Sequence, residues 1–140
     1  MTLPRLIFIF LVYGFPTNIG SYEYECSNLS ELQCIFRYHS DIYHKDPIYF
    51  WKVINHAQYT AYSCKSVKAT ADFLHITKLH GVGADLEEYI SESIETLCVK
   101  KPVCLKRAMN MLDKKTQHSV KVKLKNPIYF GKNEIAACYH

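Results

Sequence analysis

Apolar residues recur every three or four positions along most of this chain, a spacing typical of helices that bury one face. The pattern predicts a first helix over about 30–44, where Ser30 and Gln33 form a candidate capping box. It predicts further helix over 47–78, as one long helix or two collinear ones, because Asp46 is a suitable cap and Pro47 suits a first helical position. The fold class expected from this periodicity is mainly α.

The later part of the chain predicts two more helices and one strand. Asp85 and Glu88 form a second candidate capping box before a helix that reaches Cys98, and Pro102 marks another start. From 119 to 125 the period changes to two, since apolar residues alternate with lysines, and this favours a short edge strand. The apolar members are Val120, Val122 and Leu124, and the lysines are Lys121, Lys123 and Lys125. The Asn-Pro step after this segment predicts a last helix, which carries Cys138.

The amino terminus has the layout of a signal peptide. Arg5 is the only charged residue among residues 1–20, and an apolar run from Leu6 to Phe15 follows it. A run of about ten residues is shorter than the roughly twenty that a membrane span needs. We expect cleavage after Gly20 and a mature chain over 21–140; an uncleaved amino-terminal anchor is the alternative. The expected product is a single secreted, extracellular domain with no transmembrane span.

Six cysteines in an exported chain of this size favour three disulfides. They form two triplets, and the residues are Cys26, Cys34, Cys64, Cys98, Cys104 and Cys138. Structural zinc is the alternative, but zinc sites bring ligands in closer pairs than any found here. No metal or cofactor is therefore expected. The sequon at Asn28 predicts a glycan on the surface near the first cysteines.

An octapeptide occurs twice, as KDPIYFWK at 45–52 and KNPIYFGK at 125–132. Together with the cysteine triplets it suggests an internal duplication; the alternative is that the copies share only a helix-capping role. If the first helices fold back about Lys45, Cys26 and Cys64 lie opposite each other. Duplication then pairs Cys98 with Cys138, which leaves Cys34 to pair with Cys104. Six cysteines allow fifteen connectivities, so this pairing is a hypothesis.

Charge is distributed unevenly along the chain. Residues 21–97 hold six Lys and Arg against eleven Asp and Glu, whereas residues 98–132, here called the basic segment, hold ten against one. Its cations are Lys100, Lys101, Lys106, Arg107, Lys114, Lys115, Lys121, Lys123, Lys125 and Lys132. A cationic face built from them would attract sulfated glycan, anionic lipid or acidic protein. The alternative is a solvated surface that complements residues 21–97, here called the acidic half, or protects the edge strand.

Catalytic motifs are absent from the sequence. There is no nucleophile elbow, phosphate loop or HExxH pair, and cysteines in disulfides cannot act as nucleophiles. The sequence therefore predicts a binding protein rather than an enzyme, with nucleic acid unexpected because the leader exports the chain.

The abundant aromatic residues support a second hypothesis. A recognition surface or a cavity would use tyrosines such as Tyr43, Tyr49, Tyr59, Tyr62 and Tyr89, although these can equally fill gaps in a small core. If an internal cavity exists, the alternative function is a carrier of a lipid or other hydrophobic ligand. The partner and the oligomeric state do not follow from the sequence.

Overall fold

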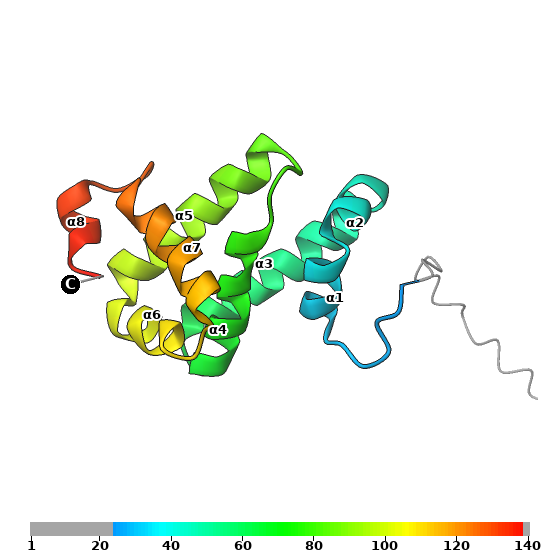
Figure 1. Ribbon diagram of the computed structural model, residues 1–140, viewed down its shortest axis with the longest axis horizontal. Coiled ribbons are helices and arrows are strands. Elements are labelled where there is room, and N and C mark those ends of the chain that lie inside the picture. Colours follow the sequence, from blue (N-terminus) through cyan, green and yellow to red (C-terminus); the bar gives the residue numbers. More distant parts are fainter. Residues whose placement is uncertain (1–23, 139–140) are drawn as a thin grey trace, which may run out of the picture.

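The computed structural model describes residues 24–138, and this part of the chain is helical and contains no strand (Figure 1). Its elements are α1 (Glu31–Arg37), α2 (His39–Lys45), α3 (Pro47–Ser63), α4 (Val67–Leu74), the 3₁₀ turn η1 (His75–Lys78), α5 (Ala84–Lys100), α6 (Pro102–Met109), α7 (Lys114–Lys125) and α8 (Lys132–Ala136). The mainly helical, disulfide-linked fold class is therefore confirmed. The expected leader lies outside the described residues.

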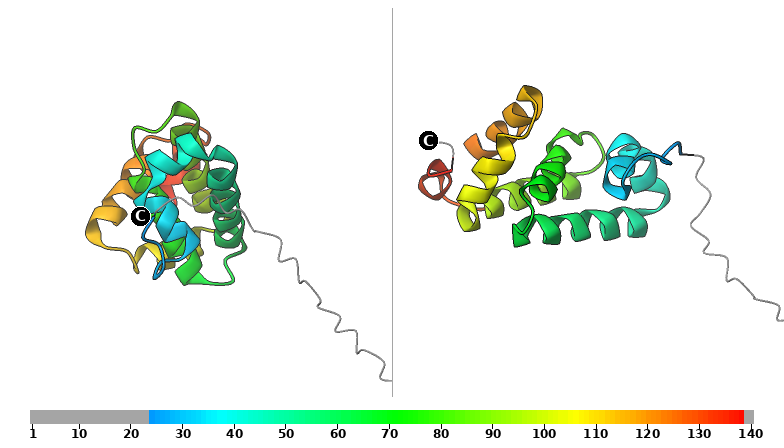
Figure 2. Two further views of the ribbon diagram at one scale, coloured as in Figure 1. Left: turned by 90° about the vertical axis from the view of Figure 1, so that its right-hand side faces the viewer. Right: turned by 90° about the horizontal axis from the view of Figure 1, so that it is seen from below.

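The two longest helices, α3 and α5, run along the molecule, and the short helices gather toward its ends (Figure 2). α1 and α2 pack on α3 at one end, whereas α6, α7 and α8 pack around α5 at the other. α4 packs on both α3 and α6 and so connects the two ends. The surfaces of the ends are thus built from different parts of the sequence.

α5 lies at the centre of a single cluster of buried side chains. Its apolar residues Leu86, Ile90 and Ile94 are almost fully buried, at spacings of four residues that place them on one face. Because helices and the loop between α7 and α8 cover its remaining sides, α5 also buries Ser93 and Glu95. Both have partners: the amide of Gln58 donates to the Ser93 hydroxyl at 2.7 Å, and Glu95 is described below. Buried polar groups without such partners are strongly destabilising.

Two of the three predicted helix caps are present. The Ser30 hydroxyl accepts from the amide of Gln33, whose side chain accepts from the Ser30 amide, so the capping box is confirmed. The Asp46 carboxylate accepts from the Tyr49 amide at the start of α3. The Asp85 capping box is wrong, because the N-cap of α5 is Gly83, two residues earlier. The Asp85 carboxylate instead accepts from the Tyr43 hydroxyl at 2.7 Å and ties α5 to α2.

The two long helical stretches that the periodicity predicts are each divided. Residues 30–44 form α1 and α2, separated at Tyr38. Residues 47–78 form neither one helix nor two collinear ones, since α4 packs back against α3. The reversal occurs after Cys64, whose φ of 55° is left-handed and ends α3. Helical periodicity passes through such a turn unchanged because both helices continue to bury apolar residues.

The predicted edge strand at 119–125 is wrong, because these residues belong to α7. The side chain of Asp113 caps this helix by accepting from the Thr116 amide at 2.9 Å. Thr116, Val120 and Leu124 are fully buried at a spacing of four residues, whereas Val122 is 42 % exposed. The buried face therefore has the helical period, and the alternation of valine and lysine is incidental.

The expected helix after Asn126-Pro127 is also displaced. Residues 126–131 form an irregular loop with bends at 126 and 128–130, and α8 begins only at Lys132 and ends before Cys138. The second octapeptide therefore lacks the helix that the first one starts. No helix among the described residues is long and apolar enough to cross a membrane.

The disulfides join Cys26 to Cys34, Cys64 to Cys104 and Cys98 to Cys138. The predicted Cys98–Cys138 pair is thus present, but the predicted Cys26–Cys64 and Cys34–Cys104 pairs are wrong. These predictions assumed a long helical hairpin about Lys45. Because α1 and α2 are separate short helices, no such hairpin brings Cys26 beside Cys64. The pairing does not repeat between the halves of the chain.

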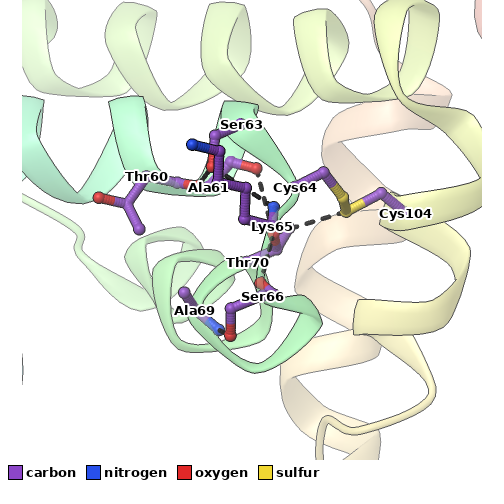
Figure 3. The surroundings of a disulfide bond; sticks show 9 residues. All are labelled: Thr60, Ala61, Ser63, Cys64, Lys65, Ser66, Ala69, Thr70 and Cys104. Carbon is purple, nitrogen blue, oxygen red and sulfur yellow. Dashed lines mark hydrogen bonds between the residues drawn. A yellow bond between two sulfur atoms is a disulfide. The ribbon is translucent and has the colours of Figure 1, made fainter.

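The Cys64–Cys104 disulfide joins the end of α3 to α6, and Figure 3 shows its surroundings. The Thr70 hydroxyl lies 3.1 Å from the Ala61 carbonyl and 3.5 Å from the Cys104 sulfur. Thr70 is fully buried on α4. The turn that reverses the chain after α3 is therefore held both by a covalent bond and by a buried hydrogen bond.

Candidate anion-binding surface

The basic segment lies at the end of the molecule that α6, α7 and α8 form. Lys100 and Lys101 lie where α5 meets α6, and Lys106 and Arg107 lie on α6. α7 carries five more lysines, and Lys132 begins α8. All of the predicted anion-binding side chains except Lys123 are exposed. The structure therefore places accessible cations from the end of α5 to the start of α8.

The lysines of α7 are arranged by the helix and not by a strand. Lys114, Lys121 and Lys125, here called the lysine face of α7, recur at spacings of seven and four residues and therefore lie on one side of the helix. His118, four residues after Lys114, lies on the same side of the helix. The expected grouping of Lys121, Lys123 and Lys125 was specific to the strand. The helix keeps two of the three together and replaces the third by Lys114.

Lys123 points to another side of α7, toward α5. Its ammonium lies 2.8 Å from a carboxylate oxygen of Glu87, and its side chain is only 23 % exposed. His80 also approaches Glu87, at 3.8 Å. Glu87 was not among the residues singled out from the sequence, and no local signal identifies it. Lys123 is therefore a contact between helices and not a free binding cation.

The remaining nine cations of the basic segment have no carboxylate partner among residues 24–138. The one acid of the segment, Asp113, is paired with Lys78 at 3.3 Å. Hydrogen bonds from the Thr116 hydroxyl and amide, together with Lys78, hold the pKa of Asp113 well below its ordinary value. Intramolecular neutralisation by the acidic half is thus limited, in the described structure, to Lys123.

Three of the free cations surround a small cleft at the start of α6. The cleft has a volume of about 360 Å³, and Lys100, Lys101 and Arg107 line it together with the Cys64–Cys104 disulfide. No side chain caps α6, whose first helical residue is Pro102. The amino end of a helix carries partial positive charge, which adds to that of the three side chains. This cleft is the most concentrated cationic feature of the basic segment.

A second and larger cleft, of about 510 Å³, lies between α1 and the α4–η1 connection. Arg37, His75 and Lys78 line it with leucine and phenylalanine side chains. Burial lowers the pKa of His75, so its ring is neutral at pH 7. The sequence did not indicate this cleft, because its walls come from residues about forty positions apart.

The tyrosines expected to line a surface or cavity mostly fill the core. Tyr43, Tyr49, Tyr62 and Tyr89 pack against the buried cluster, and Tyr89 contacts Trp51 with ring centroids 5.0 Å apart. Burial, the largest cause, raises the pKa of Tyr62 and of Tyr89. Neither of the two clefts includes a tyrosine. Tyr59 alone among the five is strongly exposed, at 76 %.

Asn28, the predicted glycan acceptor, is exposed in a turn that the Cys26–Cys34 disulfide closes. The described residues contain no cluster of histidine, cysteine and acidic side chains that could hold a metal ion. Comparison of the chain with protein-family models, with curated proteins and with solved structures found no match.

Proposed function

We propose that this chain is a secreted, non-enzymatic binding protein whose basic segment engages an anionic extracellular partner. The observation that carries this proposal is the set of nine exposed cations without a carboxylate partner among the described residues. A surface whose charges already neutralise one another attracts little, whereas unpaired cations on neighbouring helices attract polyanions over about a Debye length. Sulfated glycan is the partner class that the first experiment uses.

The extracellular location is part of the same proposal. It is supported by the apolar leader in the sequence and by three disulfides, which persist in oxidising compartments. The accessible sequon at Asn28 supports glycosylation on that route. The protein for the experiment is therefore purified from the medium of a eukaryotic host, where its intact mass reports leader removal, any glycan and the oxidised cysteines.

The test compares two charge reversals of equal size. K121E/K125E changes the lysine face of α7, and K52E/K65E changes two exposed lysines of the acidic half that also lack carboxylate partners among the described residues. Two surface charge contacts contribute up to about 1 kcal/mol each, so we expect about tenfold weaker heparin binding for K121E/K125E near physiological salt. The control pair should bind nearly as the wild type does. Circular dichroism should show unchanged folding, since all four side chains are exposed.

Two results would contradict the proposal. If both pairs weaken heparin binding equally, net charge alone controls retention and the basic segment is not a site. If neither pair changes it, the cations have no role in binding. The alternative function, a carrier of a hydrophobic ligand, needs a cavity, and the larger cleft is the feature that favours it.

A further inference from the structure

The larger cleft separates two parts of the structure that do not pack tightly on each other. One wall is α1 with the residues that precede it, and the other is the end of α4 with η1. α1 packs instead on α2 and α3, and α4 packs on α3 and α6. Its volume of about 510 Å³ lies within the range of sites that hold small organic ligands.

Apolar surface predominates in the lining of this cleft. Leu32 and Phe36 lie one turn apart on the same face of α1 and are half-buried. Leu79, which is 2 % exposed, also lines the cleft from beyond η1. The neighbouring Ile35 is fully buried, so α1 already fills its place in the core through another residue. An apolar ligand would remove the remaining exposed surface of Leu32 and Phe36 from water, at about 25 cal/mol per Å².

The charge around the cleft is predominantly positive. Arg37 is exposed and has no carboxylate partner among residues 24–138. Lys78 contributes a second cation, which it shares with Asp113 at 3.3 Å. Asp72 is the one carboxylate in the lining, and Lys68 pairs with it at 2.6 Å. A ligand that carries a negative group therefore finds a free cation at the edge of an apolar surface.

The polar groups that remain are already engaged. Ser30 and Gln33 form the capping box of α1. One ring nitrogen of each lining histidine also has a partner: Nδ1 of His39 lies 3.1 Å from the Phe36 carbonyl, and Nδ1 of His75 lies 3.5 Å from the Thr116 hydroxyl. Arg37 is therefore the principal polar side chain available to a ligand. The combination favours a molecule with a single anionic head and an apolar chain over a sugar or a nucleotide, which would need many more hydrogen-bond partners.

We propose that the cleft between α1 and η1 binds an amphipathic carboxylate of the fatty-acid class, with its chain on Leu32, Phe36 and Leu79 and its carboxylate on Arg37. This site is independent of the basic segment, so it would hold even if the proposed anion-binding surface fails. Burial of the ligand's hydrocarbon chain would supply the affinity, and Arg37 would select the anionic head.

The experiment measures decanoate and 1-decanol binding to the intact oxidised protein by calorimetry at pH 7.4, below any micellar concentration. We expect saturable one-to-one binding of decanoate and weaker binding of decanol. R37Q should weaken decanoate binding about tenfold and leave decanol unchanged, because only the carboxylate contacts the guanidinium. K52Q, an equal loss of charge on α3, should change neither. L32S should weaken both ligands.

Other outcomes would overturn the proposal. Absence of saturable decanoate binding would remove the site. Equal decanoate affinity in R37Q and wild type, or decanol affinity as high as that of decanoate, would remove the anionic class of ligand. A loss of decanoate binding in K121E/K125E with no loss in L32S would move the ligand to the basic segment.

Discussion

The two copies of the octapeptide, 45–52 and 125–132, begin alike and then take different structures. In each copy the first lysine is the last residue of a helix, α2 or α7. The next residue has nearly the same backbone, with φ −142° and ψ 72° at Asp46 and φ −122° and ψ 63° at Asn126. From there the first copy starts α3, whereas the second continues as an irregular loop until α8.

The side chain before the proline faces opposite directions in the two copies. Asp46 faces forward, where its carboxylate accepts from the Tyr49 amide at 3.0 Å. Asn126 faces backward, where its amide donates to the Val122 carbonyl at 3.1 Å. Asp46 therefore satisfies a donor of the helix that follows, and Asn126 satisfies an acceptor of the helix that precedes it.

The residues after each copy explain why only one helix continues. Phe50 is followed three and four positions later by Val53 and Ile54, which are buried with it. The equivalent positions after Phe130 are Asn133 and Glu134, both exposed. A proline and a cap can begin a helix, but burial of an apolar face has to maintain it.

Glu95 supplies the acceptors for the backbone amides of the second copy. This fully buried residue of α5 accepts from the amides of Ile128, Tyr129 and Phe130 at 2.7, 2.8 and 2.9 Å. Three hydrogen bonds to one carboxylate fix the loop on the core. The comparison shows that the same residues IYF can be held by their own helix or by a distant side chain.

Among substitutions that test the difference between the copies, we expect E95A to cause the largest loss of stability. It leaves three partly buried amides without acceptors, each at a cost of up to about 1–3 kcal/mol, and it opens a cavity where the Glu95 side chain was fully buried. We expect the free energy of unfolding to fall by at least about 3 kcal/mol in urea titrations. E92A changes an exposed glutamate of the same helix and should cost less than about 0.5 kcal/mol. A loss below about 1 kcal/mol for E95A would mean that the loop is held by other contacts.

A smaller effect is expected at the start of the first copy. D46A removes the cap of α3 and should lower the free energy of unfolding by about 1 kcal/mol. D46N introduces the residue of the second copy and should cost only a few tenths of a kcal/mol, because asparagine caps as well as aspartate does. Urea titrations of the two variants make the comparison. If D46N costs as much as D46A, the residue before the proline alone explains the difference between the copies.

The sequence predicted those helices whose starts and apolar faces are both local. Ser30, Asp46 and Pro102 begin helices as predicted because each acts on amides within one turn of itself. α7 was missed although its signals were present: Asp113 is a suitable cap, and Thr116, Val120 and Leu124 repeat every four residues. The alternation of lysines with apolar residues over 119–125 indicated a strand instead.

Features that depend on tertiary contact were not predictable in the same way. Asp85 has the spacing of a capping box, yet its carboxylate binds Tyr43 from a helix forty-two residues away. Glu95 looks like a solvated residue of an amphipathic helix, and only the packing of the final loop makes it buried. Two disulfide pairs failed for the same reason, since their prediction assumed a straight helical hairpin.

The candidate site was partly predictable. The excess of cations over 98–132 follows from counting, but which of them are free does not. Lys121 and Lys123 have the same local surroundings in the sequence, while the helix exposes one and pairs the other with Glu87. The larger cleft gave no signal at all, because Arg37 and Lys78 meet only through the fold.

The smallest expected effect is on the pKa values of Tyr49 and Tyr129, the equivalent tyrosines of the two copies. Burial raises the pKa of both phenols above the ordinary 10.0; Glu31 and Asp46 add to the effect at Tyr49, whereas Glu88, Glu92 and Glu95 add to it at Tyr129. Since the folded state holds these protons more tightly, their contribution to stability is present below pH 10.0 and is lost as the pH rises through the raised pKa values.

A neighbouring carboxylate disfavours the phenolate, so its removal should lower the pKa of the tyrosine beside it. We expect E92Q to lower the pKa of Tyr129 and leave that of Tyr49 unchanged, and E31Q to do the reverse. NMR titration of ring-labelled tyrosine, assigned with Y49F and Y129F, makes the measurement, and both changes should shrink in about 1 M salt because exposed charges are screened. If E92Q changed both tyrosines equally, the two copies would share one electrostatic environment despite their different structures.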